Sequence, residues 1–308
     1  MLLINLKNDT ISCQIAPEIG GAIYSLDYHT DKVTQNLMRT TWGEAAHLIT
    51  DFACWPLVPF SNRIRDGRFQ FMGQDYQIPT NYLGHPHASH GQAWEHPWQI
   101  QHHDASRCDL SFSFDDKTVW PFPYTAAQKF KLFDNGLAIT LSMTNAGTQP
   151  MPAGIGLHPY FPKPPGTTLQ AQVSHLWEID ATVLPTQRIV VPPQYNFATP
   201  KPLDQTRLDH CFEGYGGFME IVWPNRPVKL NVTSSPRLRH FVVYTPEGKD
   251  FFCAEPVSHM PDAVNRMTQI DTGLVILNPG ESLSADYHFE AVRPKTPSVR
   301  GQELPSHQ

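Results

Sequence analysis

Two alternating runs meet at Asp134-Asn135-Gly136: residues 128–133 read Gln-Lys-Phe-Lys-Leu-Phe, and residues 137–143 read Leu-Ala-Ile-Thr-Leu-Ser-Met. Alternation of apolar and polar residues with period two is typical of a half-buried strand. Asn-Gly between two such runs is a strong hairpin signal, because both residues tolerate positive φ. The stretch therefore predicts an antiparallel β-hairpin that turns at Asn135-Gly136.

Similar short runs recur along the rest of the chain, at residues 3–6, 11–15, 22–28, 68–71, 75–78, 229–233, 240–244 and 282–289. No segment carries a sustained apolar stripe of period 3.6, and Thr41–Leu48 is predicted as one short helix. Strands never alternate with long helices, so an antiparallel sandwich or barrel is expected and a parallel α/β sheet is not. We predict an all-β domain over residues 1–292 and a polar, proline-bearing extension over 293–308.

The composition narrows the class of protein. Charged residues make up 17% of the 308 positions, and the formal net charge is −6. This balance argues against nucleic acid as a partner, because phosphate binding needs a basic face. No apolar run approaches the ~18 residues of a membrane span, and residues 1–9 do not resemble the start of a signal peptide. We therefore expect a cytoplasmic protein with no nucleic-acid or membrane partner.

Several familiar kinds of site are not indicated. The five cysteines are scattered and form no Cys-x-x-Cys, which favours neither a disulfide framework nor a zinc–thiolate site. The chain has no Gly-x-Ser-x-Gly elbow for a nucleophilic serine. It also has no Gly-x-Gly-x-x-Gly or phosphate-binding loop, so these motifs do not predict a nucleotide cofactor.

Histidines are numerous, at 15, and several stand with other polar groups in apolar or aromatic surroundings. Such positions are Asn62-Arg63, His85 to His90, His158, Asp209 and Glu255. A few polar groups that converge among apolar side chains are the expected composition of a ligand pocket.

Two of these positions carry a specific expectation. Arg63 has apolar neighbours, so we expect it to be buried and paired with a carboxylate or with substrate oxygens. Glu255 follows Phe251-Phe252-Cys253-Ala254, so burial should raise its pKa from ~4.3 toward the range useful for a base.

The spacing of His85, His87 and His90 also allows a metal site. It is the spacing of the His-x-His-x-Asp-His motif of metallo-β-lactamase-like hydrolases, but Ser89 stands where that motif has aspartate. Those enzymes also need alternating strands and helices. A loop in which only one of the three histidines acts is the simpler interpretation.

Together these motifs resemble the aldose 1-epimerases, or mutarotases. The resemblance runs in fixed order through Asn62-Arg63-Ile64, Ser89-His90-Gly91, Gly156-Leu157-His158-Pro159-Tyr160-Phe161, Leu208-Asp209-His210-Cys211-Phe212, Tyr244-Thr245, Glu255 and Pro261-Asp262-Ala263-Val264-Asn265. Each motif alone is weak, but their order is specific. The resemblance implies a single large antiparallel β-supersandwich and a monosaccharide substrate, without metal or cofactor, in a monomer or a homodimer.

The resemblance also implies roles for individual residues. Glu255 would be the general base and His158 the general acid, while Asn62, Arg63, His90 and Asp209 would hold the sugar. With reference pKa values of ~4.3 and ~6.5, modest tuning would give an ionised base and a protonated acid together near neutrality. Tyr160 and Trp94 are candidates to pack on the apolar face of the sugar.

Two departures from the family pattern leave the identity of the sugar open. Pro162 stands where many members have asparagine, and Val242-Val243 replaces the Gln-Phe pair of many galactose-type members, whose glutamine contacts the sugar. A hexose 6-phosphate or another modified sugar is an alternative substrate, for which Arg65, Arg68 and Arg266 could supply cations. A noncatalytic carbohydrate-binding sandwich is the alternative from another class of protein.

Overall fold

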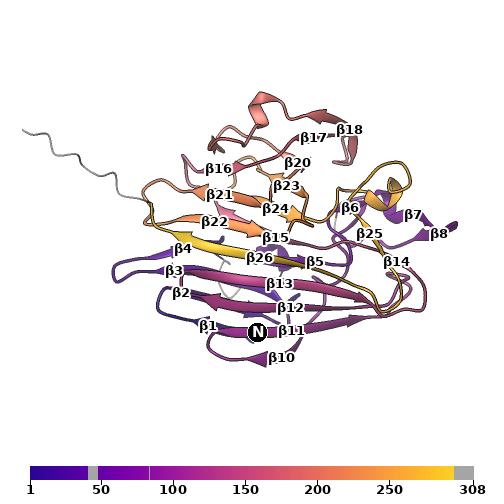
Figure 1. Cartoon of the computed structure of the whole chain (residues 1–308), viewed down its shortest axis with the longest axis horizontal. Coiled ribbons are helices and arrows are strands. Elements are labelled where there is room, and N and C mark those ends of the chain that lie inside the picture. Colours follow the sequence, from indigo (N-terminus) through magenta and orange to yellow (C-terminus); the bar gives the residue numbers. More distant parts are fainter. Residues whose placement is uncertain (41–47, 83, 295–308) are drawn as a thin grey trace, which may run out of the picture.

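The computed structural model describes residues 1–40, 48–82 and 84–294. Among these residues, one antiparallel sheet has eleven strands and a second has nine. The strands of both sheets cross the molecule in the same general direction (Figure 1). The prediction of a large antiparallel β-sandwich is confirmed.

The larger sheet is, in spatial order, β1 (Ile4–Lys7), β2 (Ile11–Ala16), β3 (Ala22–His29), β5 (Cys54–Leu57), β15 (Gly156–Pro162), β24 (Phe251–Val257), β23 (His240–Tyr244), β20 (Asp209–Glu213), β17 (His175–Ile179) and β18 (Pro185–Val190), with β4 (Thr34–Asn36) paired to β3. The second sheet is β10 (Gln99–His103), β11 (Arg107–Phe114), β12 (Tyr124–Phe133), β13 (Gly136–Asn145), β26 (Ser282–Val292), β22 (Lys229–Ser234), β21 (Phe218–Val222), β16 (Thr168–Ala171) and β19 (Lys201–Pro202).

Shorter elements join these sheets. The small strand pairs are β14 (Met151–Ala153) with β25 (Val275–Leu277), β6 (Arg63–Ile64) with β9 (Ala88–Ser89), and β7 (Arg68–Phe71) with β8 (Gln74–Gln77). The helical pieces of the described chain are single 3-10 turns: η1 (Ile49–Asp51), η2 (Arg65–Gly67), η3 (Pro193–Tyr195) and η4 (Ala263–Asn265). In Figure 1, β6, β7 and β8 lie together at the right-hand end of the molecule.

Strand periodicity explains how the core forms. On β13, Leu137, Ile139, Leu141 and Met143 are all buried in the main apolar core. The strands β15 and β24 differ, because consecutive residues are buried on both faces. A strand covered on both faces shows a continuous apolar run in place of alternation. These two strands therefore contribute one face to the core and keep the other for a second cluster.

The hairpin at residues 128–143 is confirmed, but the reason given for its glycine is wrong. Phe133 pairs with Gly136, so the turn residues are Asp134 and Asn135, and neither Asn135 nor Gly136 has a positive φ. A Cβ atom at position 136 would lie 2.2 Å from the backbone oxygen of Phe289. Glycine is required there because β26 approaches closely.

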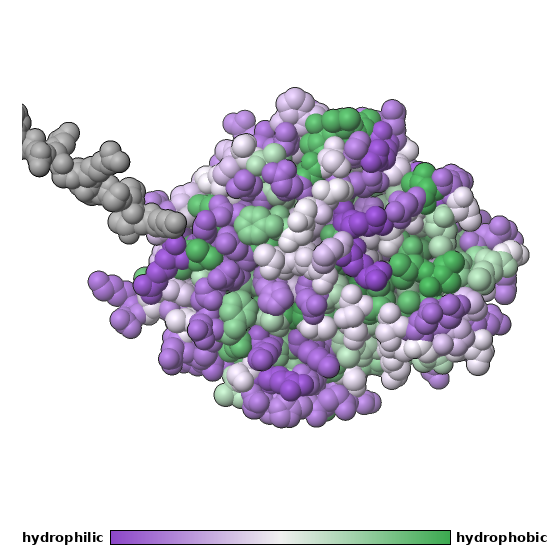
Figure 2. Space-filling view, viewed as in Figure 1, coloured by the Kyte–Doolittle hydropathy of each residue, from purple (hydrophilic) through white to green (hydrophobic). Residues whose placement is uncertain are grey.

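Two predicted segments, a short helix and the C-terminal extension, lie only partly within the residues that the structure describes. Residues 41–47 of the predicted helix over Thr41–Leu48 lie outside the described residues. β26 ends at Val292, and the structure describes only Arg293 and Pro294 of the proposed extension, so the boundary stays a prediction. No helix in the described part of the chain is long and apolar enough to cross a membrane. Figure 2 shows a mainly polar face with apolar side chains gathered toward its right-hand end.

Candidate active site

The site is built on one face of the larger sheet, where two cross-strand rows of side chains run next to each other. The register pairs Gly156 with Val257 and Tyr160 with Cys253, so His158 on β15 stands opposite Glu255 on β24. The rows are Trp55, His158, Glu255, Val242 and Cys211, and beside them Tyr160, Cys253, Tyr244 and Asp209. Because side chains two residues apart share a face, both rows project away from the core between the sheets.

A histidine–carboxylate pair lies at the centre of the first row. The Nε2 atom of His158 is 3.5 Å from Oε1 of Glu255. Glu255 is 1% exposed and His158 is 9% exposed, which confirms the predicted desolvation of the glutamate. The other polar atoms of the pair, Glu255 Oε2 and His158 Nδ1, are buried and have no hydrogen-bond partner among the described residues. Apart from the contact with each other, the two groups therefore keep one unpaired polar atom each.

Burial shifts the pKa values of Glu255 and His158 in opposite directions. It raises the pKa of Glu255 well above its usual range, and the nearby negative charge of Asp209 adds to this increase. It lowers the pKa of His158 to about 3. The expectation that the two pKa values are only modestly tuned is therefore wrong. Because a low-dielectric site disfavours both charged forms, a protonated glutamate and a neutral histidine are favoured there.

Aromatic rings hold the histidine in place. The His158 ring stacks on Trp55 at 4.3 Å and on Tyr160 at 4.8 Å, with interplanar angles of 20° for both contacts. Behind Tyr160, the guanidinium carbon of Arg39 lies 3.8 Å from the ring centroid. A cation over an aromatic face stabilises the arrangement. The imidazole plane is thus fixed by packing on neighbouring rings.

A loop region adds further polar groups. Arg63 on β6 donates from Nη1 to Oδ1 of Asn62 at 3.1 Å, and its Nη2 lies 3.5 Å from Oδ2 of Asp209. The Arg63 side chain is 14% exposed, so the predicted pairing is confirmed, but the arginine is half-buried and not fully buried as expected. Asn62 and His90 hold each other: the Asn62 N–H donates to His90 Nδ1 at 3.1 Å, and the His90 N–H donates to the Asn62 carbonyl at 2.8 Å. Because Nδ1 accepts, Nε2 is the nitrogen of neutral His90 that carries hydrogen.

The rows and the loop together line a pocket of about 140 Å³. Its lining residues are Thr50, Trp55, Asn62, Arg63, Tyr82, His85, Ser89, His90, His158, Tyr160, Asp209, Val242, Tyr244 and Glu255. The volume is small beside the ~300–1,000 Å³ of clefts that hold drug-sized ligands. The pocket therefore suits a ligand smaller than a drug-sized molecule.

Every residue proposed for the site from sequence lines this one pocket: Asn62, Arg63, His90, His158, Asp209 and Glu255. Tyr160 also lines it, but Trp94 does not. Trp94 is buried behind Trp55, with ring centroids 5.1 Å apart, and its Nε1 donates to the Gly91 carbonyl. The pairing of β5 with β15 makes Trp55, in place of Trp94, the tryptophan that lines the pocket.

Sequence reasoning missed Trp55, Thr50 and Tyr82 as lining residues. The only signal for Trp55 was its place in an apolar run shortly before Asn62. Thr50 and Tyr82 stand in loops with no repeating pattern, so no local signal could have found them.

The hypothesis of a metal site at the three loop histidines is not supported. His90 and His87 each accept a backbone N–H at Nδ1, from Asn62 and from Asp66. In the described part of the chain, the one group of three potential metal ligands with donor atoms within 4.8 Å of one another is His158, Cys253 and Glu255. Burial raises the pKa of the Cys253 thiol well above its usual range, which disfavours the thiolate that a metal would require. The expected absence of a metal stays a prediction.

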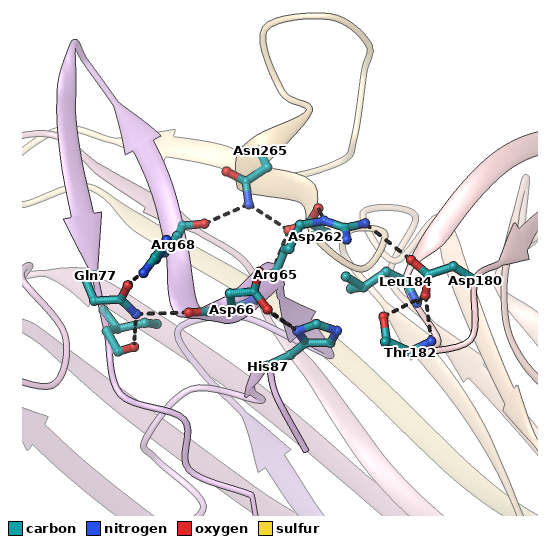
Figure 3. Close-up of polar contacts among 11 residues, drawn as sticks. Arg65, Asp66, Arg68, Gln77, His87, Asp180, Thr182, Leu184, Asp262 and Asn265 are labelled. Carbon is teal, nitrogen blue, oxygen red and sulfur yellow. Dashed lines mark hydrogen bonds and ion pairs between the residues drawn. The ribbon is translucent and has the colours of Figure 1, made fainter. Parts of the chain in front are cut away.

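The arginines considered for a phosphate group lie elsewhere. Arg65, Arg68 and Arg266 line a separate groove of about 910 Å³ together with acidic residues that include Asp262. Figure 3 shows Arg65 directed toward Asp262 and Asp180, and Arg68 bonded to Gln77. Of the described residues that line the pocket of Glu255, Arg63 is the sole arginine or lysine.

Comparisons with known proteins give a family match and related sequences. The family described as aldose 1-epimerase matches residues 2–290. The Escherichia coli (strain K12) protein YphB, described as uncharacterized, is 33% identical over 253 residues, which cover 79% of this chain and 85% of YphB. YihR from the same organism, also uncharacterized, is 27% identical over 217 residues, covering 68% and 70% of the two chains.

Solved structures show the same fold. A crystal structure of an Escherichia coli K12 protein superposes with a TM-score of 0.86 at 29% identity, covering 95% of this chain and 99% of the other. A galactose mutarotase-like protein from Clostridium acetobutylicum has a TM-score of 0.81 at 19% identity, with 95% of both chains covered.

Proposed function

This chain belongs to the aldose 1-epimerase family, and from that premise we propose that it is a mutarotase acting on a free aldose. The observation that carries the proposal is the buried pair of Glu255 and His158, 3.5 Å apart within a pocket of about 140 Å³. Arg63, Asp209, Asn62 and His90 surround that pair as candidate ligands for sugar hydroxyls.

The reaction needs one base and one acid. The base takes the proton of the C1 hydroxyl while the acid gives a proton to the ring oxygen, and the ring opens to the aldehyde. Rotation about C1–C2 followed by the reverse transfers gives the other anomer. We assign the base to Glu255 and the acid to His158. A positioned acid or base contributes about 10²–10⁴-fold.

The proton inventory of the pair supports this assignment. Neutral Glu255 with neutral His158 holds one proton, and so does the ion pair of glutamate and imidazolium. Transfer of that proton across the 3.5 Å contact converts one form into the other without exchange with solvent. The hydroxyls of a bound sugar would favour the ionised form, because they solvate charges that burial otherwise leaves unsolvated.

A free sugar is favoured over a hexose 6-phosphate. Among the described residues, the cation that lines the pocket is Arg63, and it already faces Asp209. A phosphate would need further positive charge, and the candidate arginines line the other groove. The identity of the aldose, the oligomeric state and a cytoplasmic location stay predictions.

NMR exchange measurements on α-glucose, α-galactose and their 6-phosphates test this proposal. We expect the protein to accelerate the anomerisation of at least one free aldose more than that of its phosphate. Faster turnover of a phosphorylated sugar would favour the alternative substrate class. Sugar binding with no acceleration, unaffected by His158→Ala, would mean a noncatalytic carbohydrate-binding protein.

A further inference from the structure

The backbone that carries Arg63 is held by side chains from distant parts of the sequence. Three of its N–H groups donate to such side chains within the described structure: Ser61 to His259 Nε2, Arg65 to Asp262 Oδ1 and Asp66 to His87 Nδ1, each at 3.0 Å. Figure 3 shows the Asp262 and His87 contacts on either side of Arg65 and Asp66. We name His87, His259 and Asp262 the amide clamp.

The two histidines of the clamp can serve only as neutral groups. A ring nitrogen that accepts a hydrogen bond carries no proton. His259 donates its other nitrogen, Nδ1, to the Met260 carbonyl at 2.7 Å, which fixes its tautomer. Burial lowers the pKa of His259 to about 4 and lowers that of His87, so both accept at neutral pH.

Asp262 both donates to and accepts from the backbone around Arg63. Its backbone N–H donates to the Arg63 carbonyl at 2.7 Å, while its carboxylate accepts the Arg65 N–H. Asn265 ties the same carboxylate to the Arg68 carbonyl, with donor distances of 2.7 and 2.9 Å. Asp262 and Asn265 belong to the Pro261–Asn265 motif, to which the proposed reaction assigns no chemistry.

The segment needs such restraint because its backbone is strained. Asn62, Asp66 and Asp262 have φ values of 60°, 51° and 56°, in the left-handed region. Each such residue costs roughly 1–3 kcal/mol and persists only where the surrounding structure over-determines it. Asn62 carries the side-chain oxygen that receives both the N–H and Nη1 of Arg63. A relaxed Asn62 would therefore move the guanidinium.

We propose that His87, His259 and Asp262 are positioning residues that fix the backbone around Arg63 and so hold its guanidinium in the pocket. The effect on catalysis rests on the proposed function, but the placement of Arg63 can be measured without it. The clamp residues touch no sugar in this account, and they act only through Arg63 and its neighbours.

The direct test is the NMR resonance of the Arg63 Nε–H, assigned by its loss in Arg63→Lys. We expect a dispersed, ordered signal in the unmodified protein and in His259→Gln, because the glutamine oxygen can accept in place of Nε2. In His259→Leu the signal should move toward the position of a free arginine. An unchanged Arg63 signal in folded His259→Leu would overturn the proposal, even if the protein had no mutarotase activity.

A matched pair at Asp262 covers the case in which His259→Leu does not fold. Asp262→Asn keeps an acceptor oxygen and suits a left-handed backbone, whereas Asp262→Ala loses the acceptor. If the proposed function holds, the alanine variant should lose about 10- to 100-fold in kcat/KM, and the asparagine variant should stay within about threefold.

A double-mutant cycle separates positioning from general damage. In an Arg63→Ala background, Asp262→Ala should change kcat/KM by less than about twofold, because the group it positions is gone. Equal losses in both backgrounds would overturn the proposal. Absence of activity in the unmodified protein would count against the proposed function alone, and the Arg63 resonance would still decide the clamp.

Discussion

At the scale of the residue, the site combines two ionisable groups that burial pushes toward neutrality. Glu255 and His158 face each other at 3.5 Å, and neither has another hydrogen-bond partner for its outer polar atom in the described chain. The raised pKa of Glu255 and the lowered pKa of His158 mean that the pair resists both losing its single proton and gaining a second one. The one-proton state that the proposed reaction needs is therefore favoured on both sides of neutral pH.

We predict a broad pH plateau for kcat/KM. A second proton enters only as the pH falls toward the His158 pKa of about 3, far below the ordinary value of 6.5. From about pH 5.5 to 7.5, kcat/KM should change less than about twofold after subtraction of the uncatalysed rate. An acid limb with its midpoint near the ordinary histidine value would contradict this prediction.

Trp55 should matter for both stability and rate. It is 3% exposed and stacks on His158, and its Nε1 makes no hydrogen bond within the described structure. Trp55→Ala should cost about 3–5 kcal/mol of unfolding free energy and release the His158 ring. Trp55→Phe keeps a stacking ring, so it should lose less unfolding free energy and less catalytic rate than Trp55→Ala. Urea unfolding and NMR exchange rates check this, and equal effects of the two variants would argue against the stacking role.

At the scale of the element, cross-strand register creates the site. The pairings β5–β15, β15–β24, β24–β23 and β23–β20 bring residues from four distant parts of the chain into two adjacent rows. Since every second residue faces the pocket, a shift of one residue in any pairing would send its pocket residues into the core. Glu255 sits in a buried run because its strand is covered on both faces.

Gly136 tests the account of the second sheet. Its φ is ordinary, but a Cβ there would meet the Phe289 carbonyl oxygen at 2.2 Å. Gly136→Ala should destabilise the protein by about 1–3 kcal/mol through the displacement of β26. Gly147→Ala is a suitable control, because its nearest neighbour would be a side-chain oxygen at 3.2 Å. Equal stability of the two variants in urea would show that β26 can move aside freely.

Local pattern predicted ten of the 26 strands of the described chain and singled out the polar residues of the candidate site. The hairpin of β12 and β13 follows from alternation alone, whereas its neighbour β26 lies more than a hundred residues away in sequence. The partner of Arg63 was predicted as a carboxylate or as substrate oxygens, and the structure was needed to identify Asp209. Trp55 and the clamp residue His259 carried no periodic signal, because their roles arise from contacts between distant segments.

At the scale of the whole molecule, the pocket and its clamp depend on neutral buried histidines. His259 has a folded-state pKa of about 4, below the ordinary value of 6.5. The unfolded chain therefore binds a proton in this range that the folded chain does not. The stability contributed by His259 is fully present above about pH 6.5 and is lost as the pH falls toward 4.

We predict that acid destabilises the unmodified protein more than His259→Gln. The shift corresponds to roughly 3 kcal/mol of unfolding free energy between neutral pH and pH 4. Urea midpoints measured at several pH values give the comparison. Parallel pH dependences for the two proteins would show that His259 is not held neutral by the fold.

Substitution of Glu255 by glutamine tests the central claim most directly. The change keeps the shape of the side chain and removes its ability to take a proton, while the other residues proposed to bind sugar are unchanged. With the aldose that the unmodified protein turns over, NMR exchange should show a loss of about 10²–10⁴-fold in rate, with sugar binding retained in calorimetry. Full activity of Glu255→Gln would contradict the account.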